Sequence, residues 1–306
     1  MSLSQLIERV DPIEVSGRVA QAVGIVVEGY GPMTTVGELC RITREVAGGP
    51  IAAEVVGFRG DRVLLMPLGD MHGIGPRSRI TMSGQVANLT VGPGLLGRVL
   101  DGCGNPMDGK GPLMATERYP LYAGAPNPLQ RARLRAPLDL GVRAINGFLT
   151  CGRGQKMGIF SGSGVGKSVL LGMISRYTKA DVNVIALIGE RGREVNEFLE
   201  RDLGAEALGR SVVVVATSDQ APLIRLRAAL VATTIAEYFR DAGKQVLLLM
   251  DSLTRLAYSQ REVGLAIGEP PTTKGYTPSV FTLLPKLLER VGTGPGPGTI
   301  TGLYTV

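Results

Sequence analysis

Glycine, lysine and serine side by side form the clearest chemical motif of the chain, MGIFSGSGVGKS at residues 157–168. A short apolar run leads into a glycine-rich turn that ends in Lys167 and Ser168, and a helical pattern follows over 169–177. Glycines let successive backbone N–H groups point at one anion, and the N-terminal end of a helix adds its positive dipole. The motif therefore predicts a phosphate-binding loop, in which Lys167 reaches the β- and γ-phosphates of a nucleoside triphosphate and Ser168 holds Mg²⁺. The residues expected to contact the nucleotide are Gly162, Ser163, Gly164, Val165, Gly166, Lys167, Ser168 and Val169.

One position of the loop departs from the usual pattern, which has glycine where this chain has Ser161. The other glycines keep the backbone permissive, so the prediction of a phosphate loop stands. The alternative interpretation is a glycine-rich turn with a chance Lys-Ser pair.

Two carboxylates follow buried apolar runs and extend the candidate site. Asp251 ends the run VLLLM at 246–250, where it can accept a hydrogen bond from Ser168 and from metal-bound water. Glu190 follows the apolar run that ends in Ile188, and a carboxylate there can polarise the water that attacks the γ-phosphate. Both carboxylates are expected to hold Mg²⁺ through water.

Positive charge for the transition state has two candidate sources. Arg191 follows Glu190 directly and is expected to hold the γ-phosphate, with Glu194 positioning Arg191 or the water shell. Arg255 lies about one helical turn after Asp251 and can reach either the site or a neighbouring subunit. A surface Glu-Arg pair at 190–191 is the alternative interpretation, and Asp219 and Gln220 are weaker candidates. The expected catalytic residues are Lys167, Glu190, Arg191 and Asp251.

Strands and helices alternate after the loop in a way that would bring these residues together. Apolar strand patterns cover 183–188, 211–216, 245–250 and 298–304, and helical patterns cover 169–177, 194–202, 222–242, 252–262 and 278–290. Continuous apolar strands that alternate with helices predict an α/β fold with a mostly parallel sheet covered on both faces. Right-handed crossovers place the carboxyl ends of the strands at one edge, so the loop, Glu190 and Asp251 are expected to converge there.

The first part of the chain has a different pattern. Residues 1–16 form an N-terminal amphipathic segment, in which 1–10 has helical spacing, and 17–88 form a small antiparallel β-barrel domain. Its expected strands are 18–27, 39–43, 52–58, 62–66 and 79–82, with a tight hairpin at Gly60-Asp61. The third segment, 89–306, is the nucleotide-binding domain; it begins with an irregular arm rich in glycine and proline at 89–127, and 142–149 is expected to form a short helix.

Composition narrows the possible functions. The 306 residues carry a net charge of +6, contain no tryptophan and have 5 % aromatic residues, which argues against a site built on base stacking. The single histidine, His72, nearly excludes a histidine-based triad, and three distant cysteines lack the spacing of a metal site. No apolar run reaches the roughly 20 residues of a membrane span and no signal peptide opens the chain, so a cytoplasmic or peripheral protein is expected.

Three stretches together resemble the flagellar export ATPases of the type III secretion apparatus, which are relatives of the catalytic subunit of the rotary ATP synthase. They are 141–168, GERGREV at 189–195, and 246–292. The resemblance implies a barrel followed by a RecA-like domain, and hydrolysis of ATP with Mg²⁺ in a homo-hexameric ring that supports protein export. It places Lys167 on the phosphates, Ser168 on magnesium, Glu190 in catalysis, Arg191 on the γ-phosphate and Asp251 as the second carboxylate. In that family Ala or Ser is common at the position of Ser161, and related non-catalytic subunits have glutamine at the position of Glu190.

The resemblance also implies partners: export-apparatus regulator and stalk proteins, export substrates and their chaperones. The amphipathic spacing of 1–10 indicates either a helix that caps the next domain or a segment that docks on a partner or on an acidic membrane surface. Nucleic acid is not expected. Family members continue past Val306 with an arginine finger and a helical domain, so this chain is expected to be truncated and to bind ATP with little turnover. The alternatives are a virulence-type secretion ATPase, a nucleic-acid-tracking ring motor of the same fold, and a nucleotide-gated assembly module without hydrolysis.

Overall fold

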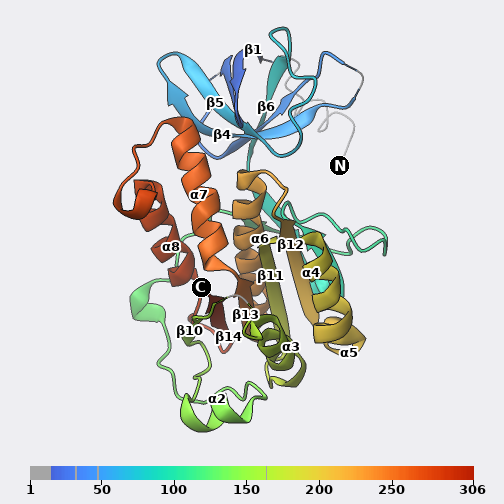
Figure 1. The fold of residues 1–306 in the computed structure, drawn as a ribbon, viewed down its shortest axis with the longest axis vertical. Coiled ribbons are helices and arrows are strands. Elements are labelled where there is room, and N and C mark those ends of the chain that lie inside the picture. The colour runs from blue at the N-terminus through green and yellow to red at the C-terminus, as the bar shows by residue number, and fades with distance from the viewer. Residues whose placement is uncertain (1–14, 32, 47, 163) are drawn as a thin grey trace, which may run out of the picture. The chain divides into compact units, whose positions relative to one another are not determined.

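The computed structural model describes residues 15–31, 33–46, 48–162 and 164–306, and the chain separates into two compact units, Met1–Ala87 and Asn88–Val306 (Figure 1). The amphipathic stretch expected at 1–10 lies outside the described residues, as does Ser163 of the predicted phosphate loop.

The first unit is a closed antiparallel barrel with the strand order β1-β2-β5-β4-β3-β6, which confirms the predicted barrel. The strands are β1 Ser16–Val23, β2 Val26–Tyr30, β3 Glu38–Ile42, β4 Ile51–Arg59, β5 Arg62–Pro67 and β6 Arg79–Val86. Alternate apolar side chains fill its interior, among them Val27, Ile42 and Leu65, each fully buried. The predicted single strand at 18–27 is wrong, since Gly24 has a φ of 59° and turns the chain into the β1–β2 hairpin.

The segment predicted as an irregular arm contains three short strands, β7 Asn88–Val91, β8 Arg98–Asp101 and β9 Glu117–Pro120. β7 and β9 pair with each other, whereas β8 joins the main sheet beside β12. The segment is therefore not irregular throughout, as the sequence had predicted. Arg98 holds the following turn through a two-pronged ion pair with Asp108, Nε to Oδ2 at 2.8 Å and Nη2 to Oδ1 at 2.9 Å. This buried pair lowers the pKa of Asp108 well below its usual range, opposed by the desolvation of the carboxylate.

The second unit is built on a sheet that has the order β10-β14-β13-β11-β12-β8 within the described residues. The remaining strands are β10 Lys156–Ile159, β11 Val182–Glu190, β12 Ser211–Thr217, β13 Gln245–Asp251 and β14 Thr299–Thr305. Each neighbouring pair is parallel, so the carboxyl ends of all the strands lie at one edge. The predicted α/β fold with a parallel sheet is confirmed.

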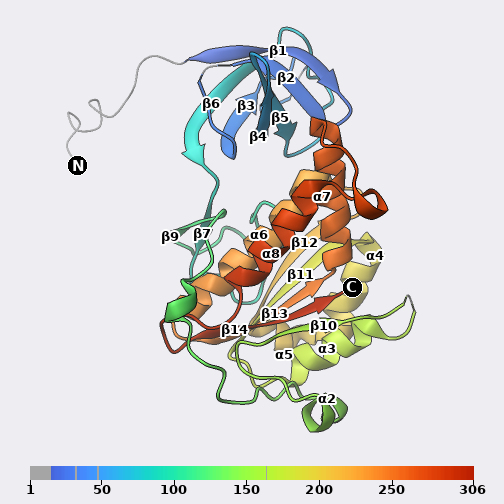
Figure 2. The same ribbon diagram turned by 90° about the vertical axis from the view of Figure 1, so that its left-hand side faces the viewer.

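Helices cover both faces of this sheet, with α3, α4 and α5 on one side and α6, α7 and α8 on the other (Figure 2). Their bounds are α2 Arg143–Phe148, α3 Lys167–Tyr177, α4 Gly192–Glu197, α5 Gly204–Gly209, α6 Pro222–Asp241, α7 Leu253–Ile267 and α8 Pro278–Arg290. Short 3₁₀ turns lie at Pro93–Leu95, Pro128–Gln130 and Thr273–Gly275. The helical stretch predicted at 194–202 is confirmed, but it begins at Gly192, and α4 passes into a π-helical turn at Phe198–Leu203 that α5 follows. The helix predicted at 252–262 is longer than expected, because α7 continues to Ile267.

The core of the second unit lies between the sheet and these helices. On the α3 side, Leu171 and Ile174 pack with Ile185 and Leu187 of β11. On the other side, α6 is buried along most of its length. None of the helices in the described part of the chain is both long enough and apolar enough to cross a lipid bilayer.

Candidate functional site

The glycine-rich loop leaves the end of β10 and leads directly into α3. Gly164 and Gly166 have φ values of 75° and 91°, a left-handed conformation that side-chain-bearing residues rarely adopt. Gly166 is also the N-cap of α3, so the loop ends where the positive end of the helix dipole lies. Among the described residues, and apart from the chain neighbours of each glycine, no atom lies within 4 Å of a Cβ built on Gly162, Gly164 or Gly166, which leaves space beside the loop backbone for a ligand.

Lys167, the first residue of α3, points at the end of β13. Its Nζ lies 2.7 Å from Oδ1 of Asp251, and the Asp251 side chain is 5 % exposed. The hydroxyl of Thr305, at the end of β14, donates to the same carboxylate oxygen at 2.7 Å. Asp251 thus accepts hydrogen bonds from Lys167 and Thr305, and the bond expected from Ser168 stays a prediction.

Glu190 ends β11 next to β13 and is buried. Nη2 of Arg255 lies 3.2 Å from Oε1 of Glu190, and Nη1 of Arg255 donates to the carbonyl of Gly189. Gly189 has a φ of 69°, and a Cβ there would lie 2.9 Å from Cδ of Arg255. Glycine at position 189 thus gives Arg255 the space to reach Glu190.

The start of α7 aims Arg255 at the site. Ser252 is the N-cap of this helix, and its hydroxyl accepts from the backbone N–H of Arg255 at 3.3 Å. Since Ser252 directly follows Asp251, the cap fixes Arg255 one turn beyond the end of β13. Sequence reasoning left open whether Arg255 reaches the site, and the structure places it there.

Three effects raise the pKa of Glu190 to about 7. Burial is the largest, followed by a hydrogen bond with Glu194 and the nearby charge of Asp251; Arg255 and Lys167 oppose the rise. The same hydrogen bond is the main reason that the pKa of Glu194 is lowered. Glu190 therefore holds the proton of the pair and exchanges it near neutral pH, which suits a group that accepts a proton from water.

Arg191 lies at the beginning of α4 and is largely exposed. Its Nη1 lies 3.1 Å from Oε1 of Glu194, so Glu194 orients Arg191 as the sequence suggested. Val165 and Val169 are also exposed, with 68 % and 45 % of their surface accessible. The two valines are close in sequence to Lys167, and Arg191 directly follows Glu190.

The loop after β12 borders Glu190 as well. The backbone N–H of Ser218 donates to the carbonyl of Glu190 at 3.0 Å. Gln220 has a buried side-chain oxygen with no hydrogen-bond partner among the described residues, whereas Asp219 is held locally by Thr217. Of the two weaker candidates, Gln220 is the one with an unused polar atom.

Sequence reasoning missed Thr305. Its only sequence signal is its place at the end of a buried apolar strand, the same signal that identified Asp251. It was overlooked because a threonine at a strand end is common and carries no charge.

The site can be described chemically as a glycine-rich loop, one lysine and two acids at a single sheet edge. Lys167 supplies a cation, Asp251 a carboxylate that accepts two hydrogen bonds, and Glu190 a buried carboxyl group with a matching cation in Arg255. Hard oxygen groups of this kind suit Mg²⁺, and the free loop backbone suits phosphate oxygens.

Comparison with known proteins gives matches in both units. Residues 19–84 match the ATP synthase alpha/beta family, beta-barrel domain, and residues 141–306 match the nucleotide-binding domain of the same family. The flagellum-specific ATP synthase of Bacillus subtilis (strain 168) is 53 % identical over 308 residues, covering 100 % of this chain and 70 % of that protein. The type 3 secretion system ATPase of Xanthomonas euvesicatoria is 52 % identical, covering 95 % of this chain and 65 % of that protein.

A solved structure agrees with these matches. The assembled ATPase EscN from the type III secretion system of enteropathogenic E. coli has a TM-score of 0.88 and 47 % identity, covering 95 % of this chain and 69 % of that chain. EscN in complex with its central stalk EscO has a TM-score of 0.87. The chain spans about two thirds of the length of these relatives.

Proposed function

Because the chain belongs to the ATP synthase alpha/beta family, we propose that it hydrolyses ATP with Mg²⁺ in a ring of identical subunits and so supports protein export. The proposed export system is the flagellar type III secretion apparatus. The single observation that carries the enzymatic part is the convergence of Lys167, Glu190 and Asp251 at the sheet edge beside an open glycine loop.

Binding of ATP would begin at the glycine loop. Its backbone N–H groups and the N-terminal end of α3 would hold the phosphates. Lys167 would leave its ion pair with Asp251 and bind phosphate oxygens instead. The exchange is favourable because a triphosphate carries several negative charges and Asp251 carries one. Asp251 stays in place through its bond from Thr305.

Magnesium fits this donor set: Ser168 and Asp251 would hold it, and when bound it neutralises charge that develops on the phosphates. Glu190 would hold the attacking water and take its proton as the bond to the γ-phosphorus forms. Arg255 stabilises the ionised form of Glu190, and Arg191, held by Glu194, would contact the γ-phosphate.

Assembly and export are proposed from the relatives. EscN is an assembled ATPase and binds a central stalk, EscO, and several of the similar curated proteins are flagellum-specific. A homo-hexamer with a stalk partner is the arrangement we propose for this chain, together with a cytoplasmic position at the inner face of the membrane. A virulence-type secretion ATPase is the second candidate, since a type 3 secretion system ATPase is 52 % identical.

Phosphate release from ATP by the purified chain tests the enzymatic proposal. Release should require Mg²⁺ and should disappear in Lys167→Ala, while the exposed-surface control Arg135→Ala keeps it. Absent release from the wild-type chain would favour a nucleotide-gated assembly module, and release that persists in Lys167→Ala would refute the site.

Deleting the gene in its source organism separates the two export systems. The flagellar proposal predicts that secretion of the flagellar filament protein stops. Loss of virulence-protein secretion with intact flagella would replace it by the second candidate.

A further inference from the structure

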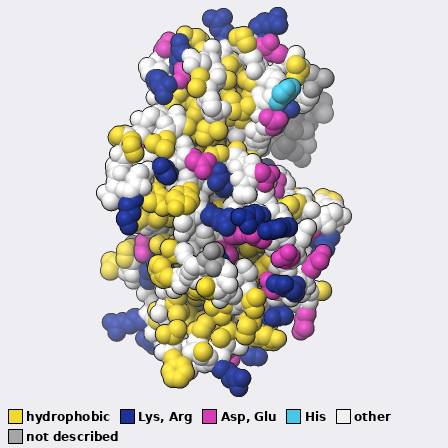
Figure 3. Space-filling view, in the orientation of Figure 1, with side chains coloured by type: hydrophobic (Ala, Val, Ile, Leu, Met, Phe, Trp, Pro, Cys, Tyr) yellow, Lys and Arg dark blue, Asp and Glu magenta, His cyan; other side chains and the backbone are white. Residues whose placement is uncertain are grey.

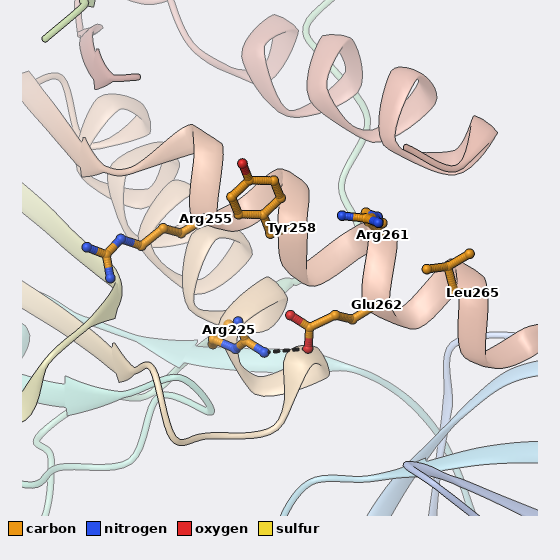
Figure 4. Close-up of a pocket in the computed structure, with 6 residues that line it drawn as sticks. All are labelled: Arg225, Arg255, Tyr258, Arg261, Glu262 and Leu265. Atoms are coloured by element: carbon orange, nitrogen blue, oxygen red, sulfur yellow. Dashed lines mark hydrogen bonds and ion pairs between the residues drawn. The ribbon is translucent and has the colours of Figure 1, made fainter. Parts of the chain in front are cut away.

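Two pockets beside helices α6, α7 and α8 differ in their chemistry. The first is an open groove along α7 (Figure 4), and it belongs to the candidate site because Arg255 lines it and also pairs with Glu190. Figure 3 shows a band of Lys and Arg side chains at the level of α6 and α7 in Figure 1. The second pocket has mostly apolar walls and lies in another part of the same unit.

This second pocket, the α6–α8 pocket, has a volume of about 590 Å³ and lies between α6, α8 and the coil at 122–125 (Figure 2). Glu289 at its rim binds Nζ of Lys156 at 2.9 Å, and Lys156 is the first residue of β10. The rim therefore lies beside the amino end of a strand, whereas the nucleotide site lies at the carboxyl ends. The two sites are separate.

Apolar side chains of the two helices line the α6–α8 pocket together with small residues of the coil. Leu230 comes from α6, and Leu283 and Leu287 come from α8. A Cβ built on Gly124 of the coil would have no atom of the described residues within 4 Å, apart from its chain neighbours, so the coil leaves the space open. Sites for small molecules have volumes of roughly 300–1,000 Å³ and walls of this kind.

A buried guanidinium lines the pocket as well. The side chain of Arg290 is 3 % exposed, and its Nε and Nη2 pair with Glu237 at 2.9 Å and 2.6 Å. Nη2 also donates to the hydroxyl of Thr234, and Nη1 donates to the carbonyl of Leu121. Arginine has five N–H groups, and these bonds use four. The fifth, on Nη1, has no acceptor among the described residues, so a ligand oxygen that reaches it would gain a hydrogen bond.

The rim of the pocket carries a positive charge. Lys286 is exposed, and its ammonium group has no ion pair or hydrogen bond within the described part of the chain. Glu289 is neutralised by Lys156 and, at 3.5 Å, by Arg131, and the buried ion pair of Arg290 has no net charge. The balance therefore favours an anionic ligand.

The two cations are within reach of one ligand group. Lys286 and Arg290 are four residues apart on α8, so they lie on one face of the helix, roughly 5–6 Å apart at their Cβ atoms. Leu283 and Leu287 lie on the same face, one turn apart. A single carboxylate or sulfonate can thus contact both cations while an apolar body packs against the leucines.

We propose that the α6–α8 pocket binds a small amphiphilic anion, which is an apolar body that carries one carboxylate or sulfonate group. The anionic oxygens accept from Nη1 of Arg290 and pair with Lys286. The apolar body packs against Leu230 and Leu283 and against the coil. This binding does not depend on the proposed ATPase function.

Two fluorescent probes with one ring system test the chemistry. 8-Anilinonaphthalene-1-sulfonate carries the anion, and N-phenyl-1-naphthylamine lacks it. Each is titrated into the purified chain with Mg²⁺ and a saturating non-hydrolysable ATP analogue. The sulfonate should bind at one site per chain and about tenfold more tightly than the neutral probe, because it adds charge-assisted hydrogen bonds.

Two variants with matched controls place the binding in the pocket. Gly124→Leu fills part of the space and should weaken both probes at least about tenfold, whereas Gly296→Leu, at an exposed glycine with equally open surroundings, should change neither. Lys286→Glu should weaken the sulfonate about tenfold and leave the neutral probe within about twofold. Lys179→Glu, at an exposed lysine outside the pocket, is its control. Thermal unfolding of each variant checks that it is folded.

Decanoate and 1-naphthoate, a chain and a ring with one carboxylate each, should compete with the sulfonate probe, and the stronger competitor identifies the shape of the apolar body. Equal affinity of the two fluorescent probes would overturn the anionic ligand. Sulfonate binding that is absent, that the ATP analogue displaces, or that folded Gly124→Leu retains in full would overturn the pocket as its site.

Discussion

The ionisation of Glu190 gives a direct pH prediction for ATP turnover. Its pKa is raised to about 7, chiefly by burial, and the group accepts a proton only when it is ionised. Turnover should therefore rise with pH through the neutral range. A carboxylate with its ordinary pKa would be ionised throughout this range and would give a flat profile.

The size of the effect follows from the titration. With a pKa of about 7, roughly a tenth of the molecules have an ionised Glu190 at pH 6 and roughly nine tenths at pH 8, so the rate should rise about tenfold. Removing the hydrogen bond in Glu194→Ala should move the midpoint to lower pH. Removing the cation in Arg255→Gln should move it to higher pH, since Arg255 opposes the rise.

The assay is single-turnover hydrolysis of radiolabelled ATP with the protein in excess, measured from pH 5.5 to 8.5 at constant ionic strength. Binding of a fluorescent ATP analogue at each pH is the control, because it separates proton transfer from affinity. A rate that is flat or falls between pH 6 and 8, with binding intact, would refute the assignment of Glu190 as proton acceptor. Midpoint shifts opposite to those stated for the two variants would refute its electrostatics.

Two further predictions concern the geometry of the site. Gly189→Ala should lower turnover by about tenfold or more and cost about 1–2 kcal/mol of stability, because a Cβ at a φ of 69° is strained and would lie 2.9 Å from Cδ of Arg255. Gly192→Ala, where a Cβ meets no atom within 4 Å, is the matched control in the same kinetic and denaturant-unfolding assays; equal losses in both would contradict the reason given. Asp251→Asn should raise the affinity for ATP without Mg²⁺ several-fold, because Lys167 no longer has to leave a carboxylate. The same variant should reduce the increase in affinity that Mg²⁺ gives. Calorimetric titration with and without the metal measures both changes.

The position of the site could be predicted from sequence because it depends on strand ends. An apolar run that ends in Glu190 or Asp251 marks the carboxyl end of a buried parallel strand, and such ends share one edge. The glycine loop is equally local, since its residues are contiguous and lead into α3. The catalytic and metal-binding roles of these residues stay predictions that the proposed measurements address.

Contacts between distant residues could not be predicted in the same way. Lys167 and Asp251 are 84 residues apart, and their ion pair depends on how β13 and α3 pack. The reach of Arg255 to Glu190 depends on the φ of Gly189 and on the helix cap, which a motif does not encode.

Short elements were missed for a related reason. β8 has only four residues, flanked by glycines and prolines, and its strand character comes from pairing with β12 more than 100 residues later. The break between α4 and α5 follows from the π-helical turn and from Gly204, which has a φ of 75°. The helical pattern over 194–202 predicted this helix but not its π-helical turn, because the apolar residues continue through the turn.

The central claim is that Glu190 acts in the chemical step at a nucleotide site formed by the glycine loop and Lys167. Its most direct test is Glu190→Gln, which keeps the shape of the side chain and removes its ability to take a proton. Single-turnover hydrolysis should fall by about 10²–10⁴-fold, while the dissociation constant for Mg²⁺-ATP changes by no more than about threefold. Hydrolysis at the wild-type rate, or a loss of nucleotide binding as large as the loss of hydrolysis, would contradict the claim.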